Sequence, residues 1–168
     1  MNIFQSTAQP INIHNQTLLL STAAEQGAGL ANAYCALTST ILISPSELSL
    51  NDTVRKESSY KFNVTNMGNS LANYKLSHQG AALATGKASG DDQLLAIPQY
   101  SANYATVTFD PSEFELGSQE TREITLRFTE PAGANSNLLP IYSGFVYVTN
   151  QINGEAVHLT CKSRGYSI

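Results

Sequence analysis

Apolar and polar residues alternate along most of the chain between residues 42 and 160, in short runs bounded by turn residues. One clear run buries every second position: Tyr60, Phe62 and Val64 alternate with polar neighbours. A period of two is typical of strands with one buried face. Together with equivalent runs further on, the pattern predicts about seven strands, at 60–65, 74–76, 107–109, 114–116, 124–128, 142–149 and 156–160.

Turn residues separate these runs. The sequence Asn66–Asn69 contains residues that tolerate a positive φ, so the chain is expected to reverse there. Asn153-Gly154 is typical of a hairpin turn that matches strand twist. Two segments rich in small residues, Gly80–Gln93 and Pro131–Asn137, are expected to form a long loop or ragged edge and an irregular segment, respectively.

This arrangement predicts an all-β fold, an antiparallel β-sandwich whose strand order the sequence does not determine. The segment before residue 42 differs, because Leu30, Ala33, Tyr34 and Leu37 have the spacing of one helical stripe. We therefore expect an irregular arm with one short helix ahead of the sandwich. We also expect residues 41–160 to fold autonomously and residues 1–37 to be loosely held.

The charge pattern argues against several partners. Only 13% of the residues are charged, the formal net charge is −4, and no Lys or Arg precedes Arg55. A nucleic-acid backbone requires a basic surface, so nucleic acid is not expected as a partner. The apolar runs are also too short to span a bilayer, and the polar start of the chain does not resemble a secretory signal.

Catalytic chemistry is not expected in this chain. A hydrolase would need a nucleophile, a base and a group that orients the base. Only His14, His78 and His158 could serve as the base, and none of them accompanies a nucleophile elbow. The histidine at position 78 is more simply explained as a structural hydrogen-bonding residue.

No cofactor or metal is expected either. Gly27 and Gly29 lack the preceding strand and the third glycine of a dinucleotide site, so they more simply shape a helix entrance. Asp91-Asp92 lacks the further oxygen ligands of a calcium loop and is expected to be a solvated acidic loop. Cys35 and Cys161 match no zinc or redox spacing; we interpret them as small buried side chains, with their pairing left open.

Three glycosylation sequons occur, at Asn15, Asn51 and Asn63. Because the chain is rich in Asn, Ser and Thr, this number is what chance predicts, and it does not argue for secretion. A free-standing adhesion or carbohydrate-binding module is the alternative function for an all-β chain of this kind. Against a sugar-binding role, the chain has no Trp, and aromatic residues make up only 8%.

The run from Ile141 to Val148 is apolar on both faces of the predicted strand. Such a strand is either covered on both sides or exposes a patch that binds a partner. Two interpretations remain open for its candidate interface residues, Phe145 and Tyr147: burial beneath a loop, or a docking face for another domain.

Several segments, taken together, resemble a known family. Residues 26–34 read QGAGLANAY, which is similar to the segment that closes the catalytic domain of subtilisin-like serine proteases. Upstream, STAQP at 6–10 resembles the stretch after the helix that carries the nucleophile. Downstream segments resemble the fibronectin-type-III-like domain fused behind that catalytic domain in secreted or cell-envelope enzymes of the minor extracellular protease type: SPSELSLND at 44–52, FNVTNMG at 62–68, YKLSH at 74–78 and LPIYSGFV at 139–146.

The resemblance implies three regions: residues 1–38 as a remnant of the catalytic domain's C-terminal end, 41–160 as a fibronectin-type-III-like sandwich, and 161–168 as a tail. The family's Gly-Thr-Ser nucleophile motif is missing, so the chain is expected to be a non-catalytic fragment. By resemblance, such a domain scaffolds the catalytic domain, which would be its partner, and helps to position protein substrates. The implied location is extracellular or in the cell wall, although no signal peptide is recognised in the chain.

Overall fold

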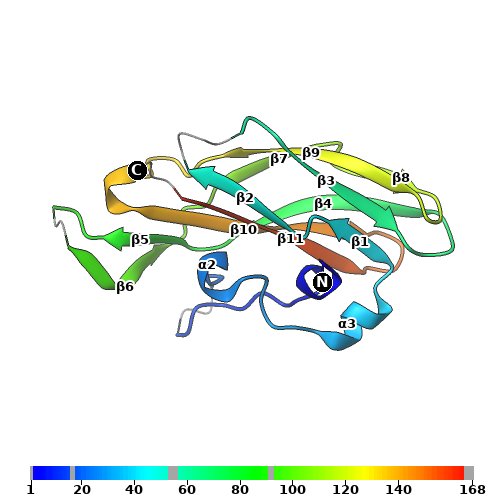
Figure 1. The fold of residues 1–168 in the computed structure, drawn as a ribbon, viewed down its shortest axis with the longest axis horizontal. Coiled ribbons are helices and arrows are strands. Elements are labelled where there is room, and N and C mark those ends of the chain that lie inside the picture. Colours follow the sequence, from blue (N-terminus) through cyan, green and yellow to red (C-terminus); the bar gives the residue numbers. More distant parts are fainter. Residues whose placement is uncertain (1, 16–17, 53–56, 91–92, 165–168) are drawn as a thin grey trace.

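The computed structural model describes residues 2–15, 18–52, 57–90 and 93–164. It confirms the all-β sandwich: two stacked sheets enclose a common core, and an arm that contains short helices lies against the outer side of one of them (Figure 1). None of the described helices is long and apolar enough to cross a membrane.

The smaller sheet has four antiparallel strands in the order β1-β3-β9-β7. Its strands show why alternation predicts burial: Tyr60, Phe62 and Val64 face the core, while Lys61 and Asn63 between them are exposed. The strands of this sheet are β1 (Ile41–Ser44), β3 (Tyr60–Asn66), β9 (Thr121–Thr129) and β7 (Thr106–Asp110).

The larger sheet contains seven strands, in the order β2-β11-β10-β4-β8, with a β5–β6 hairpin attached to the start of β10. The pair β2–β11 is parallel, a departure from the expected antiparallel pattern. The strands are β2 (Glu47–Asp52), β11 (Ala156–Arg164), β10 (Pro140–Asn150), β4 (Ala72–Gly80), β8 (Glu113–Leu116), β5 (Leu83–Lys87) and β6 (Leu94–Ser101).

Two segments expected to be irregular contain regular structure. The expected loop at 80–93 contributes β5, and a hairpin links β5 to β6. The sequence pattern of β6 does not alternate, because Leu94 and Ile97 are both exposed and Pro98 lies within the strand. A single 3-10 turn, η1 (Ser136–Leu138), overlaps the end of the segment 131–137. Asn135 precedes the turn, and its side chain accepts a hydrogen bond from the Asn137 backbone.

The C-terminal strand is longer than expected. β10 and β11 pair from Thr149↔Ala156 to Ile141↔Arg164, so residues 161–164 of the expected tail belong to the sheet. The hairpin between them includes Asn153-Gly154 as predicted, with Gly154 at φ 75°, but it is closed by a hydrogen bond from Asn150 to Glu155. The domain boundary near residue 161 therefore moves to the end of β11.

The arm contains three short helices where one was expected: α1 (Asn2–Ser6), α2 (Ala23–Gln26) and α3 (Ala33–Thr38). α3 overlaps the predicted helix, but its apolar stripe is not buried, because Tyr34 and Leu37 are 76% and 84% exposed. The Asn32 side chain caps α3 by accepting a hydrogen bond from the Cys35 backbone. The helix therefore begins at Ala33 and does not include Leu30. Leu30 instead forms a β-bridge with Gln9.

Candidate functional site

The outer face of the β10–β11 pair carries the candidate interface residues and lies beneath the arm. Phe145 is directly opposite Thr160, and Tyr147 is opposite His158. The His158 ring meets Phe145 edge-on at 5.1 Å between centroids and Tyr147 at 5.7 Å. Phe145 and His158 are buried, at 0% and 2% exposure, while Tyr147 is half-buried.

The segment that covers this face is residues 18–30 of the same chain, which we call the strap. Phe145 packs in a small cluster with Ala23 of the strap and Ala81, and Leu20 and Tyr147 pack against it. Of the two interpretations of this strand, the structure favours burial beneath a covering segment. Contact of Phe145 and Tyr147 with a separate catalytic domain stays a prediction.

Polar contacts hold the strap to the sheet. The Ser143 side chain accepts a hydrogen bond from the Ala23 backbone at 2.9 Å, and its hydroxyl lies 3.0 Å from that of Thr22. The Ala82 backbone donates to the carbonyl of Leu20 at 2.9 Å. Thr22 also caps α2 by accepting from Ala24, which places the start of α2 directly over β10.

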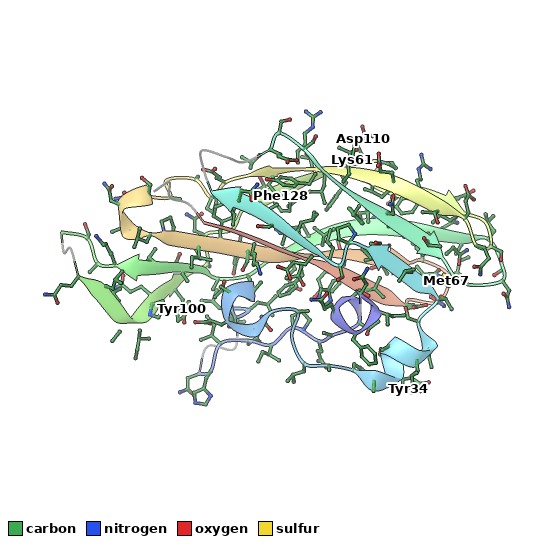
Figure 2. The ribbon with its side chains drawn as sticks, viewed as in Figure 1. Tyr34, Lys61, Met67, Tyr100, Asp110 and Phe128 are labelled. Carbon is green, nitrogen blue, oxygen red and sulfur yellow. The ribbon has the colours of Figure 1, made fainter. Side chains whose placement is uncertain are left out.

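A carboxylate links α2 to the β5–β6 hairpin. Glu25 accepts hydrogen bonds from Ser21 and from the phenolic hydroxyl of Tyr100 of β6, which Figure 2 labels beside that strand. The hydrogen bond to Glu25 and then burial raise the pKa of Tyr100 to about 12, so its hydroxyl remains a donor near neutral pH.

A second carboxylate holds the junction between α3 and β1. Glu155, in the β10–β11 turn, accepts from the Ser39 hydroxyl at 2.6 Å, from the Thr40 backbone at 2.8 Å and from the Thr40 hydroxyl at 2.5 Å. Three donors converging on one carboxylate fix the exit of the arm against the sandwich.

Two buried polar atoms beneath the arm have no hydrogen-bond partner among the described residues: His158 Nε2 and Thr160 Oγ1. Burial lowers the pKa of His158 to about 4, and a weaker polar contact with the backbone of Ala28 acts in the opposite direction. Burial also raises the pKa of Tyr147. Both rings are therefore neutral at pH 7.

The arm has a polar inner side and an apolar outer side. Four of its hydroxyl residues are buried: Ser6, Thr7, Ser21 and Thr22. Six of its large apolar side chains face solvent instead, and Figure 2 shows Tyr34 pointing away from the sheets. These exposed residues are Phe4, Ile11, Leu18, Leu30, Tyr34 and Leu37. Soluble domains usually bury such side chains, so this outer face is a candidate interaction surface.

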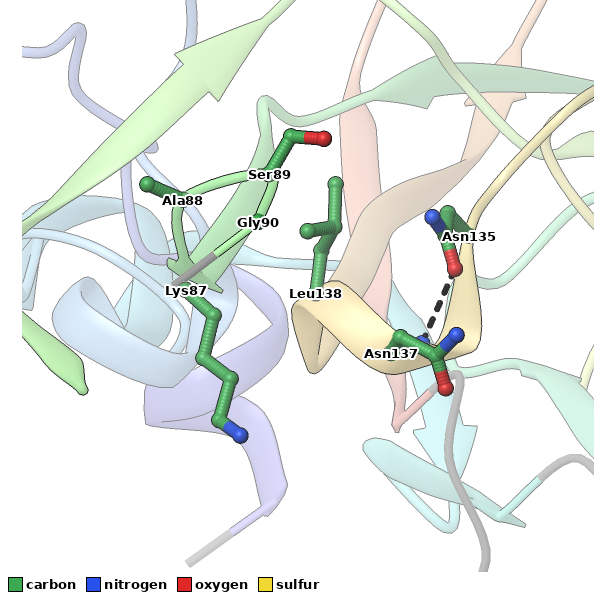
Figure 3. A pocket seen from close by; sticks show the side chains of 7 residues that line it. All are labelled: Lys87, Ala88, Ser89, Gly90, Asn135, Asn137 and Leu138. Carbon is green, nitrogen blue, oxygen red and sulfur yellow. Dashed lines mark hydrogen bonds between the residues drawn. The ribbon is translucent and has the colours of Figure 1, made fainter. Parts of the chain in front are cut away.

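A shallow hollow of about 500 Å³ lies between the end of β5 and η1 (Figure 3). Its described lining is mostly polar or small and contains no aromatic ring on which a sugar could stack. The lining residues are Lys87, Ala88, Ser89, Gly90, Asn135, Asn137 and Leu138. The carbohydrate-binding alternative thus gains no stacking platform here.

The histidines considered for catalysis do not come together. His14 is exposed on the arm, His158 lies beneath the strap, and His78 of β4 is opposite Val146, so its ring faces the sandwich core and meets Phe128 edge-on. Within the ranges that the structure describes, no three His, Cys, Asp or Glu residues are grouped to hold a metal ion. Asp91-Asp92 lies outside these ranges.

The remaining candidates are separate from this face. Asn15, Asn51 and Asn63 are all exposed, as glycosylation would require, but the hydroxyl residues of the first two sequons lie outside the described residues. Cys161 is buried as expected, whereas Cys35 is only half-buried, and the two are not paired.

Sequence reasoning missed Thr22, Ser143 and Glu155, which anchor the arm. One signal was available: Thr22 and Glu25 have the Thr-x-x-Glu spacing of a helix N-terminus. For Ser143 and Glu155 the sequence offers no comparable signal, because their partners are 120 and about 115 residues away.

Comparison with known proteins decides the family. A family model described as "Fn3-like domain" matches residues 48–159, which is most of the sandwich. The chain belongs to the Fn3-like domain family. Fn3-like domains are non-catalytic, in agreement with the expectation that this chain alone is not an enzyme.

Solved structures of similar fold include PapD-like domain 7 of human CEP192, with 15% identity and a TM-score of 0.52; the match covers 77% of this chain and 87% of that one. A family 123 glycoside hydrolase from Clostridium perfringens gives 10% identity and a TM-score of 0.48; the match covers 77% of this chain and 28% of that one. At 15% identity the likeness to the CEP192 domain concerns the fold alone. No curated protein shows significant sequence similarity to the Fn3-like chain.

Proposed function

We propose that this chain is a non-catalytic accessory domain of a subtilisin-like serine endopeptidase, which scaffolds the catalytic domain and helps to position protein substrates. The Fn3-like domain model that matches residues 48–159 also occurs in subtilases. The segment that resembles the end of the catalytic domain, residues 26–34, lies on the arm that packs on this sandwich. The implied location of the parent enzyme is extracellular or in the cell wall.

The observation that carries the proposal is the two-sided arm. On its inner side, the Thr22 hydroxyl and the Ala23 backbone bond to Ser143 of the sandwich, while its outer side leaves Tyr34, Leu37 and other large apolar residues exposed. Between residues 2 and 40 the only charged residues are Glu25 and, when protonated, His14. An uncharged apolar surface suits a folded protein domain better than an anionic membrane, which attracts Lys and Arg. We assign that partner as the catalytic domain.

The first test of the proposal concerns the coding sequence upstream of Met1. An open reading frame that encodes the Gly-Thr-Ser-x-Ala-x-Pro motif shortly before this chain is expected, together with upstream Asp and His segments. A transcript that begins at Met1 and has no such frame upstream would favour the alternative, a free-standing adhesion or carbohydrate-binding module.

The second test measures binding of this chain to the separately expressed catalytic domain by calorimetry. Replacing an aromatic anchor at the centre of an interface typically costs about 2 kcal/mol, so Tyr34→Ser and Leu37→Ser should each weaken binding markedly. The matched control is Leu71→Ser, an exposed apolar residue outside the arm, which should bind as the original chain does. Equal effects from all three variants would contradict docking through the arm.

Phe145→Ser tests the earlier interface prediction separately. Because Phe145 is buried against Ala23 of the strap, this variant should loosen the strap and weaken assembly indirectly, while the main core remains folded. Circular dichroism distinguishes a folded sandwich with a loosened strap from a chain that fails to fold. A Phe145→Ser chain that fails to fold would show that this residue belongs to the core that the sandwich needs.

A further inference from the structure

The contact between the strap and the sheet contains a titratable ring in an unusual setting. His158 lies beneath the strap, its Nε2 atom has no hydrogen-bond partner among the described residues, and the Thr160 hydroxyl on the same face is also unpaired. Its ring edge is packed against Phe145. A proton added to this ring would place a charge in a site without a carboxylate partner, which a buried site tolerates poorly.

The charged and titratable groups around this face are engaged elsewhere. On β10 the neighbour of His158 is the Tyr147 ring, and on α2 the Glu25 carboxylate binds Ser21 and Tyr100. On β2, Glu47 forms an ion pair with Lys162 of β11 at 2.5 Å. α1 consists of Asn, Ile, Phe, Gln and Ser and contributes no ionisable side chain.

We propose that the strap is an acid-released cover: protonation of His158 lifts residues 18–30 from the sheet and exposes the aromatic face formed by Phe145 and Tyr147. The contacts that must break are both polar and apolar. The polar ones include the hydrogen bonds of Ser143 with Ala23 and Thr22, the bond from Ala82 to Leu20, the bond from Tyr100 to Glu25 and the contact of His158 with the Ala28 backbone. The apolar one is the packing of the strap against Phe145 and Tyr147. This inference concerns the chain alone and does not depend on the protease partner.

The direction of the pH effect follows from proton linkage. With the strap closed, burial holds the pKa of His158 at about 4; with the strap open, the ring returns to its ordinary value near 6.5. The open form therefore binds the proton more tightly, and acid favours it below pH 6.5, with the gain levelling off below pH 4. Between pH 7 and pH 5, linkage gives a rise of about 20-fold in the ratio of open to closed strap.

Amide hydrogen exchange measures this opening. After division by the intrinsic exchange rate, protection of the Ala82 and Ala23 amides should fall about 20-fold from pH 7 to pH 5, and at both pH values these amides should be less protected than the β3–β9 ladder. His158→Gln should abolish this pH dependence. The matched control is His78→Gln, since His78 has an equally lowered pKa of about 4 but faces the sandwich core, and it should leave the dependence intact.

Three results would overturn the proposal: no pH dependence in the original chain, the same dependence in His158→Gln, or protection of the Ala82 and Ala23 amides equal to that of the β3–β9 ladder. If His158→Gln releases the strap even at pH 7, an NMR titration of the His158 ring in the original chain decides whether the proposal holds. Ring protonation that coincides with loss of Ala82 protection supports the acid-released cover. Ring protonation beneath a strap that stays protected contradicts it.

Discussion

The side chain of Ser143 lies 2.9 Å from the backbone nitrogen of Ala23, although 120 residues separate them in sequence. One hydroxyl of a central strand thereby accepts from the first turn of α2 and also meets the Thr22 hydroxyl. Ser143 is buried at this contact, so these hydrogen bonds are shielded from water. The strap is attached through this side chain as well as through apolar contact with Phe145.

Ser143→Ala should therefore loosen the strap and leave the sandwich intact. The change leaves the Ala23 backbone N–H buried without its acceptor, which typically costs about 1–3 kcal/mol. Hydrogen exchange should show lower protection at Ala23 and Ala82 but not along β3 and β9. Ser77→Ala, at an exposed position of β4, is the control and should change neither. Unchanged protection at Ala23 in Ser143→Ala would contradict the anchoring role.

Gly144 is required where β10 passes the His78 ring. A Cβ atom at this position would lie 2.4 Å from His78 Nε2 and 2.9 Å from the Gln79 carbonyl oxygen. Gly144→Ala should lower the free energy of unfolding by about 1–3 kcal/mol, as overpacking of a core does, measured by urea denaturation. Gly86→Ala is the control, because its nearest contact of 3.7 Å is ordinary. Adding His78→Ala to Gly144→Ala should restore only part of the loss, since the Gln79 carbonyl remains.

Burial along the strands could be predicted from the sequence because only one face of each strand meets the core. Phe62 and Leu126 are buried for that reason, and the period of two reveals it. Leu37 misled the same reasoning, because helical spacing indicates which residues share a face but not whether anything covers that face. The β5–β6 hairpin escaped prediction for a related reason: Leu94 and Ile97 are apolar yet exposed, so they obscure the alternation.

The candidate site was less predictable than the fold. A strand with two apolar faces indicated that Phe145 is either covered or exposed to a partner, but the sequence could not say whether its cover comes from this chain or from another. The answer depends on hydrogen bonds such as that between Ser143 and Thr22, and a serine or threonine in a sequence does not reveal its distant partner. Directional polar contacts therefore help to determine where the arm lies, whereas the apolar periodicity of the strands determines which faces the sandwich buries.

Glu155→Ala should release the junction between α3 and β1. Three hydrogen bonds from Ser39 and Thr40 end on this carboxylate, and bonds to a charged acceptor typically contribute about 1.5–3 kcal/mol. Exchange of the Thr40 amide should become markedly faster, with Glu155→Gln intermediate because it retains one acceptor oxygen. The control is Glu123→Ala, which removes an exposed ion pair with Lys61 and should change stability by less than about 1 kcal/mol. Equal losses of stability in Glu155→Ala and Glu123→Ala would contradict a special role for this turn.

His78 should contribute to the acid lability of the sandwich. Burial lowers its pKa to about 4 in the folded chain, whereas unfolding returns the pKa to about 6.5. The unfolded state therefore binds more protons below pH 6.5, so stability is full above that pH, falls as the pH drops towards 4 and then levels off. The shift corresponds to a loss of about 3 kcal/mol at most. Urea denaturation of His78→Gln should show a smaller loss between pH 7 and pH 4 than the original chain, whereas the exposed His14→Gln control should match it. If His78→Gln loses as much stability as the original chain, the acid response lies in other groups and His78 is not its source.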